Sequence, residues 1–353
     1  MIIGTCGFCS TGSSAVSDYL KEFDENQVLD GIELTMVYLP DGIEDLDYHL
    51  NRNINRDDNC GIAIPRFRRF MQTYEHLLAV NTGIPEMEVR KKTEEYLDGL
   101  IQLKWRSTRR SDSQLYPTWF HHNVGNRLMN QRLIPLMNKM TGKSLKPYPN
   151  RTLDVCIRPD GFLDKTKEFV KWYLSAYGAD FSKNIVLDQP FIGNDPAKSF
   201  KYYGDAVAIV VDRDPRDNYI FTREILSKLG GFIPSDTVEE FVLYYKLLRH
   251  GMPYQEPNDR ILRLNFEEMV YDYDNATAKV RNFCKLPDNP RPLSVFDPKL
   301  SVNNTQLILR FPQYKKDIEY ISRELPEYLF DFDRYPKPNN KGRMFMGKSP
   351  LNK

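Results

Sequence analysis

Short apolar runs alternate with stretches of helical periodicity over much of this chain. The clearest run is Ala206–Val211, six apolar residues in succession, which is typical of a central strand in a parallel sheet covered on both faces. Further strands are predicted at 2–6, 31–37, 152–157, 184–188 and 261–265. Helices are predicted at 15–20, 86–105, 123–140, 164–177 and 276–283, and in the stretch that ends near residue 229. This alternation predicts an α/β fold whose ligands bind at the carboxyl ends of the strands.

The alternation is interrupted between residues 43 and 150, where the pattern is helical. We therefore expect one domain spanning residues 1–353, with a core formed by 1–38 and 152–345 and a helical insertion at 43–150. The core is expected to be a three-layer fold with a central parallel sheet flanked by helices. No internal repeat or low-complexity segment suggests another organisation.

Composition narrows the class of protein. The chain has 353 residues, of which 41% are hydrophobic and 27% charged, as in ordinary globular proteins. A net charge of +1 argues against broad binding to nucleic acid. Five scattered cysteines predict reduced thiols and a cytoplasmic location. No apolar run approaches 18 residues, so neither a membrane anchor nor a signal peptide is predicted. Nothing in the composition indicates an oligomeric state.

A loop of small residues follows the first predicted strand. Its sequence, Gly-Phe-Cys-Ser-Thr-Gly-Ser-Ser over residues 7–14, lies between that strand and a predicted helix. Backbone N–H groups of such a loop, with the positive end of the helix dipole, hold anions. The spacing matches a P-loop, except that Ser13 replaces the lysine that reaches the β- and γ-phosphates of a nucleotide. The loop therefore predicts a P-loop-like cradle for an anion other than a nucleoside triphosphate. Its candidate binding residues are Ser10, Thr11, Gly12, Ser13 and Ser14.

Three further motifs accompany this loop. Arg-Asp-Pro-Arg-Asp (213–217) follows the buried strand at 206–211, and 261–270 is a strand that runs into an acidic turn. Lys-Gly-Arg (341–343) lies in the tail. In this order the chain resembles the sulfotransferase superfamily, whose donor is 3′-phosphoadenosine 5′-phosphosulfate. Taken alone, 213–217 also fits an ordinary helix start, with Pro215 in the first turn.

The resemblance implies roles for these motifs. The loop at 7–14 is similar to the family's 5′-phosphosulfate loop, and Arg213 to the arginine that binds the 3′-phosphate. The family's serine eight residues after that arginine is replaced by Phe221, so its role passes to Thr222. Lys341, Gly342 and Arg343 are similar to a loop that closes over the nucleotide in the glycan-modifying branch.

The resemblance also implies a substrate. The insertion at 43–150 should carry acceptor specificity, and residues 39–50 are similar to sulfotransferases of bacterial capsule and exopolysaccharide clusters. The expected acceptor is therefore a hydroxyl of a carbohydrate, with no metal. One departure stands out: Ser10 occupies the place of a basic residue that supports the departing phosphate. A cation would come from Lys143, Arg66 or the tail, or be replaced by hydroxyl and backbone donors.

A base must take the proton of the acceptor hydroxyl. The glycan branch uses a glutamate about 20 residues past the loop glycine, and Glu33 lies 21 residues past Gly12. Glu33 stands between apolar residues, so we expect burial to raise its pKa. Asp188, at the end of the strand 184–188, is the second candidate. The pair His121 and His122 is a third, although tandem histidines more often lie at the surface.

Three other interpretations remain open. A P-loop kinase or NTPase would share the cradle, with Asp212 as a loose metal-binding aspartate. A thiol oxidoreductase is suggested by Cys6 and Cys9, although Cys6 should lie inside the strand. A catalytically impaired homologue that only binds the nucleotide is suggested by Ser10.

Overall fold

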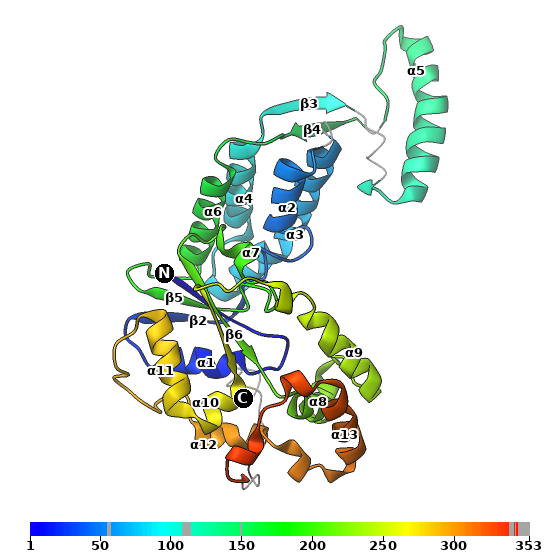
Figure 1. The fold of residues 1–353 in the computed structure, drawn as a ribbon. Coiled ribbons are helices and arrows are strands. Elements are labelled where there is room, and N and C mark those ends of the chain that lie inside the picture. The colour runs from blue at the N-terminus through cyan, green and yellow to red at the C-terminus, as the bar shows by residue number, and fades with distance from the viewer. Residues whose placement is uncertain (55–57, 108–113, 149, 339–341, 343, 345–353) are drawn as a thin grey trace. The chain divides into compact units, whose positions relative to one another are not determined.

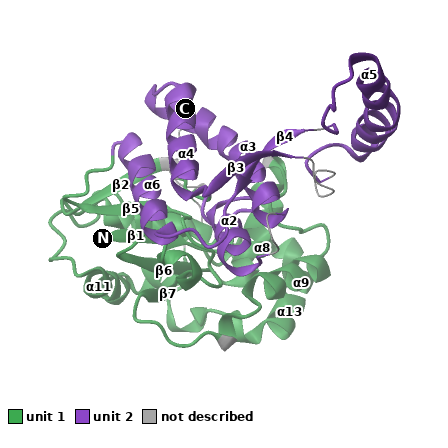
Figure 2. Ribbon diagram, turned by 90° about the horizontal axis from the view of Figure 1, so that it is seen from above, with its two compact units in different colours: residues 1–35, 179–353 green, residues 36–178 purple. Residues whose placement is uncertain are grey.

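The computed structural model describes residues 1–353 except 55–57, 108–113, 149, 339–341, 343 and 345–353. Within this part of the chain, contacts define two compact units (Figure 2). One comprises residues 1–35 and 179–353, and the other residues 36–178. The helical segment expected at 43–150 falls inside the second unit, which extends further, to residue 178.

A five-stranded parallel sheet forms the centre of the first unit, in the order β2-β5-β1-β6-β7 (Figure 2). The strands are β1 (Ile2–Cys6), β2 (Asn26–Glu33), β5 (Asn184–Asp188), β6 (Ala206–Asp212) and β7 (Ile261–Asn265). The predicted α/β class, a central parallel sheet flanked by helices, is confirmed.

The second strand lies earlier in the chain than the apolar pattern at 31–37 predicts. β2 pairs with β5 from Asn26 onward and ends at Glu33. Met36 and Val37 are buried, but their carbonyls accept hydrogen bonds from the N–H groups of Ile43 and Glu44, at the start of the next helix. The apolar pattern at 31–37 therefore arises from burial of these side chains and does not indicate strand pairing.

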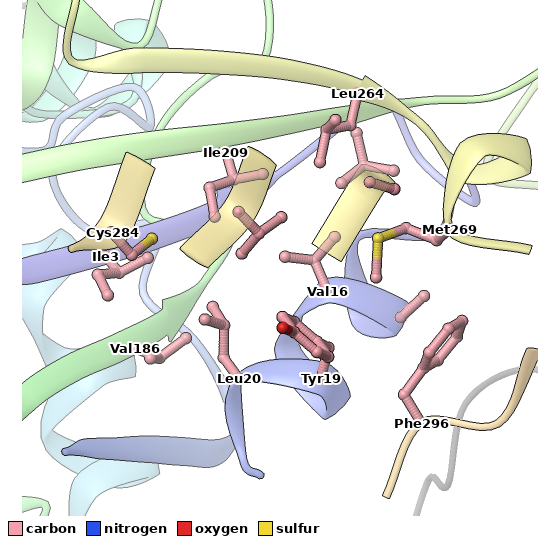
Figure 3. Packing of buried hydrophobic residues seen from close by; sticks show 14 of the residues in the cluster. Ile3, Val16, Tyr19, Leu20, Val186, Ile209, Leu264, Met269, Cys284 and Phe296 are labelled. Carbon is pink, nitrogen blue, oxygen red and sulfur yellow. The ribbon is translucent and has the colours of Figure 1, made fainter. Parts of the chain in front are cut away.

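Helices and sheet share a hydrophobic core in this unit (Figure 3). It joins Val16, Tyr19 and Leu20 of α1 (Ser13–Leu20) to Ile3, Val186 and Ile209 of the sheet. The helices α10 (Phe266–Tyr271) and α11 (Tyr273–Cys284) complete the cluster. All three side chains from the strands are less than 1% exposed, as the apolar runs require.

A second cluster holds the segments that follow β6. It packs α8 (Pro215–Glu224) against α9 (Val238–Arg249) and α13 (Lys315–Glu324). Leu307 and Met344 from the irregular C-terminal region are buried in it as well. Two short helices also belong to this unit: α7 (Ala197–Phe200) and α12 (Pro298–Ser301).

Helices and a two-stranded ribbon build the second unit. The helices are α2 (Ile43–Asp47), α3 (Asp58–Thr82), α4 (Glu86–Leu100), α5 (Ile134–Thr141) and α6 (Phe162–Ala176). A π-helical turn (Tyr48–Arg52) follows α2, and a π-helical segment (Phe120–Leu133) precedes α5. β3 (Leu103–Ser107) pairs antiparallel with β4 (Arg151–Val155).

The helix predicted at 86–105 ends early because the ribbon takes its last residues. The N–H of Gln102 donates to the carbonyl of Val155, and Leu103 pairs with Val155 in the ladder. No helix in the described part of the chain is long and apolar enough to cross a bilayer.

Candidate active site

The loop between β1 and α1 has the backbone of an anion cradle. Cys9, Ser10 and Gly12 have φ values of 70°, 52° and 92°, which turn the chain sharply into the helix. Within the described part of the chain, no acceptor takes the backbone N–H groups of Ser10 to Ser14. Unpaired N–H groups at the start of a helix attract an anion. The structure thus places Ser10, Thr11, Gly12, Ser13 and Ser14 together in one turn.

Gln189 holds this loop to the sheet. Its N–H donates to the carbonyl of Thr5 (2.8 Å), and its side-chain amide donates to Ser13 Oγ (3.0 Å). The N–H of Gly7 donates to Gln189 Oε1 (3.3 Å). The buried hydroxyl of Thr11 accepts from the N–H of Phe8 (3.1 Å). The side chain of Thr11 therefore shapes the loop, and its backbone is the part available to a ligand.

Gly12→Ala is expected to destabilise the protein strongly. A Cβ on Gly12 would lie 2.6 Å from a ring carbon of Phe266, which is fixed in the core. The positive φ costs an L-residue about 1–2 kcal/mol, and overpacking adds about 1–3 kcal/mol. Gly204→Ala is the matched control, because Gly204 has a φ of +87° with no atom within 4 Å of the added Cβ. Urea unfolding should show the larger loss of unfolding free energy for Gly12→Ala; equal losses would contradict the contact with Phe266.

Arg213 lies against the carbonyl side of this loop. Arg213 directly follows β6, which is the neighbour of β1 in the sheet, and it is only 3% exposed. Its Nη1 donates to the carbonyl of Ser10 (3.2 Å) and its Nη2 to the carbonyl of Asn304. The guanidinium also packs on the rings of Phe221 (4.7 Å) and Phe266 (5.5 Å). Among the described residues, Arg213 Nε is a buried donor with no acceptor.

Buried carboxyl groups surround Arg213. Asp217 accepts from the N–H groups of Gln306 and Leu307 (2.7 Å each). Burial and the charge of Asp214 raise the pKa of Asp217 to about 7. Burial also raises the pKa of Glu267 well above its usual value, and Glu267 accepts from the N–H of Asp214 (3.1 Å). The motif at 213–217 is thereby joined to residues 304–307.

Asp214 also starts α8. Its carboxylate accepts from the N–H of Arg216 (2.8 Å), which caps the helix at Pro215. The alternative of an ordinary helix start is therefore correct for the backbone of 214–217. It does not account for Arg213, which precedes the helix and donates to the carbonyls of Ser10 and Asn304.

The tail comes close to the same segment. The N–H of Gly342 donates to Asn303 Oδ1 (3.0 Å), and its carbonyl accepts from Arg310 (2.6 Å). Asn303 precedes Asn304, the carbonyl partner of Arg213. Lys341 and Arg343 lie outside the described residues.

The hydroxyl of Thr222, the candidate ligand for the 3′-phosphate, is already used inside its own helix. It is fully buried within α8, and its hydroxyl donates to the carbonyl of Asn218 (2.8 Å). The neighbouring Phe221 presents its ring to Arg213.

The two candidate bases lie on adjacent strands. Glu33 at the end of β2 pairs with Asp188 at the end of β5. β5 is next to β1, so Asp188 is one strand from the cradle and Glu33 is two strands away. Glu33 is exposed, and the expectation of a buried acid is wrong.

Asp188 has the environment that was expected for Glu33. It is half-buried, and one of its carboxylate oxygens has no partner among the described residues. Burial, and then the charge of Glu33, raise the pKa of Asp188 to about 6. The charge of Glu33 also raises the pKa of the Cys9 thiol, after the larger effect of burial. The charge of Glu33 therefore acts on two other groups at this edge of the sheet.

The other candidates for the missing cation, Arg66 and Lys143, and for the base, His121 and His122, belong to the unit of residues 36–178. Arg66 forms an ion pair with Asp41. Lys143 is exposed just beyond α5, and His121 and His122 lie in the π-helical segment. The site described here consists of residues from the other unit.

The cysteine pair does not have the character of a redox motif. Burial raises the pKa of Cys6 to about 12, and burial raises that of Cys9 as well. A redox-active thiol has a lowered pKa, so these raised pKa values do not support the thiol-oxidoreductase interpretation. Within the described residues, no group of three or more His, Cys, Asp or Glu side chains could hold a metal.

Sequence reasoning missed residues that hold the loop from outside. Asn218 Nδ2 donates to the carbonyls of Cys9 (3.3 Å) and Ser10 (3.4 Å). Gln189 is the other, and Asn304 acts indirectly, because its carbonyl accepts from Arg213. The position of Gln189, directly after a strand end, was the only sequence signal for any of them. Asn218 contacts the loop through the loop's backbone, which leaves no signature in the loop's side chains.

Comparison with known proteins gives structural likeness only. No family model and no curated protein matches the chain. A sulfotransferase domain from the curacin biosynthetic pathway is similar over 93% of this chain and 98% of its own, with 12% identity and a TM-score of 0.39. Sulfotransferase STF1 from Mycobacterium tuberculosis H37Rv is similar over 92% of this chain and 76% of its own, with 10% identity and a TM-score of 0.35. Sulfotransferase STF9 from Mycobacterium avium covers 95% of this chain and 76% of its own, with 15% identity and a TM-score of 0.35.

Proposed function

We propose that this protein is a sulfotransferase that moves a sulfuryl group from 3′-phosphoadenosine 5′-phosphosulfate to a hydroxyl of a carbohydrate. One observation carries the proposal. The lysine-less loop after β1 and Arg213 after β6 meet through the hydrogen bond from Arg213 to the carbonyl of Ser10. The two motifs that resemble the two anion-binding elements of the family thus lie together at the carboxyl edge of the sheet.

The donor fits the polar groups present. The unpaired N–H groups of Ser10 to Ser14 would hold the 5′-phosphosulfate at the N-terminus of α1. The unpaired Nε of Arg213 would face the 3′-phosphate, near the tail segment that Gly342 anchors. Lys341, Gly342 and Arg343 would close over the nucleotide. Thr222 contributes only through α8.

The reaction needs one proton acceptor. The acceptor oxygen attacks sulfur, the sulfur–oxygen bond to phosphate breaks, and adenosine 3′,5′-bisphosphate leaves. We assign the proton to Asp188, because it lies beside the cradle strand, has an unpaired oxygen and has a pKa near 6. A base with that pKa is ionised at neutral pH and still able to take a proton. Glu33 would act through Asp188, raising the pKa of that carboxyl.

Charge on the leaving phosphate must be stabilised without the family's basic residue. Ser10 stands in its place, so the N–H groups of the loop and the dipole of α1 would carry this role. The same Ser10 supports the second candidate function, a homologue that binds the nucleotide but transfers nothing.

Nucleotide binding separates these proposals from a P-loop kinase. We expect adenosine 3′,5′-bisphosphate without metal to raise the melting temperature, because ligand binding to the native state stabilises it. ATP with Mg²⁺ should give a smaller shift, because the loop has Ser13 at the position of the lysine that reaches the terminal phosphates. Differential scanning fluorimetry and calorimetry measure both. A preference for ATP with Mg²⁺ would favour a kinase and overturn the sulfotransferase.

Transfer of labelled sulfate then tests the acceptor. Polysaccharides, lipid-linked glycans and small phenols would be compared with one preparation of protein. Turnover confined to phenols contradicts the carbohydrate. Nucleotide binding with no transfer to any acceptor supports the impaired homologue.

A further inference from the structure

A basic arm in the second unit has no role in the site described above. We define it as residues 114–148, which contain the π-helical segment, α5 and the chain that returns beside them (Figure 1). The arm has five basic residues and no aspartate or glutamate. Its basic residues are Arg127, Arg132, Lys139, Lys143 and Lys146.

The arm's apolar side chains follow the helical period. Phe120, Val124, Leu128 and Leu133 recur every four or five residues, as in a π-helix. From Leu133 the spacing changes to that of an α-helix, and Leu133, Leu136, Met137 and Met140 fall on one face.

Only part of this apolar surface is covered. Phe120 packs on Tyr116 and on Tyr148 of the returning chain, and Asn130 bonds to the backbone of Tyr148. The α-helical face stays open: Leu136 is 53% and Met140 76% exposed. Trp119, at the start of the helix, is 69% exposed. A folded protein rarely leaves a row of large apolar side chains in water without a partner.

The basic residues beside the open apolar face indicate what kind of partner would cover it. Arg132 and Lys139 are seven residues apart and lie on the flank next to Leu136, as the 100° helical step requires. An apolar face bordered by basic residues, with a tryptophan at one end, suits the interface of an anionic bilayer. A second copy of this arm would bring like charges together, which disfavours self-association.

We propose that the basic arm binds anionic lipid bilayers, with the face of Leu133, Leu136, Met137 and Met140 inserted at the level of the headgroups. This inference does not depend on the proposed function.

Vesicle co-sedimentation with the full chain tests it. We expect binding to vesicles of phosphatidylcholine with phosphatidylserine, and much weaker binding to phosphatidylcholine alone. Each basic residue near an anionic surface strengthens binding by roughly 5-fold. Arg132→Gln with Lys139→Gln should therefore weaken binding to anionic vesicles by about 25-fold. High salt should act in the same direction.

A matched pair of variants isolates the apolar face. Leu136→Asp with Met140→Asp should weaken binding by at least about 10-fold. Leu243→Asp with Leu247→Asp on α9 has the same spacing and charge change, and both leucines are 60% exposed; binding should not change. Circular dichroism verifies that each variant is folded.

Three results would overturn the proposal. The first is no binding to anionic vesicles. The second is equal binding by the arm variants and the α9 variants. The third is a dimer, seen by sedimentation velocity, that the Leu136 and Met140 substitutions dissociate, which would identify a second copy as the occupant. Binding of dextran sulfate without vesicle binding falls under the first result and would assign the arm to soluble polyanions.

Discussion

Asp188→Asn is expected to lower kcat for sulfate transfer by about 10²–10⁴-fold, the usual contribution of a general base. Asparagine keeps the size of the side chain and cannot accept a proton at neutral pH. The affinity for adenosine 3′,5′-bisphosphate should stay nearly constant, because Gln189 and not Asp188 contacts the loop. Initial rates at saturating donor, with calorimetry of the same preparation, separate the two effects.

Glu33→Gln is the control for Asp188→Asn. The direction in which its pH profile shifts tests whether Glu33 acts through the pKa of Asp188. The base must be ionised, so kcat/KM should rise as pH rises through about 6, the pKa of Asp188. The charge of Glu33 raises that pKa, so its removal should move the acid limb of the profile to lower pH with little change in the plateau. A large loss of kcat in Glu33→Gln, with near-normal Asp188→Asn, would return the role of base to Glu33, as the sequence first suggested.

Arg213→Ala is expected to weaken binding of adenosine 3′,5′-bisphosphate by about 10- to 150-fold, since a charge-assisted hydrogen bond contributes about 1.5–3 kcal/mol. It should also lower the free energy of unfolding, because the carbonyls of Ser10 and Asn304 each lose a charged donor. A hydrogen bond to a charged group contributes about 1.5–3 kcal/mol. Calorimetry at a temperature where the variant is folded gives the affinity, and urea unfolding gives the stability.

Arg216→Ala distinguishes a binding role from a structural one. Arg216 also contacts a backbone carbonyl, that of Phe330 (2.8 Å), and pairs with Asp214 (2.6 Å), but it makes no contact with the cradle loop among the described residues. It should destabilise the fold while leaving nucleotide affinity within about 3-fold. Equal losses of affinity in both variants, or none in either, would remove Arg213 from the nucleotide site.

The strands that are buried on both faces could be predicted from the sequence. β1, β5 and β6 coincide with their apolar runs, because a strand covered by helices needs apolar side chains at successive positions. β2 and β3 could not be located in this way. β3 is mostly exposed along its length and pairs with β4 through backbone hydrogen bonds, which apolar periodicity does not report.

The loop at 7–14 and the motif at 213–217 were evident from the sequence alone, because small residues and a buried strand before each motif constrain the local backbone. Their meeting was decided by the tertiary structure, which makes β1 and β6 neighbours and buries Arg213 between two carbonyls. The tertiary structure also decided which of Glu33 and Asp188 has the raised pKa expected of a base. Both are acids at strand ends in the sequence, but their pKa values depend on burial and on each other's charge across the sheet. Those quantities are fixed by strand order and register, which bring together residues more than 150 positions apart.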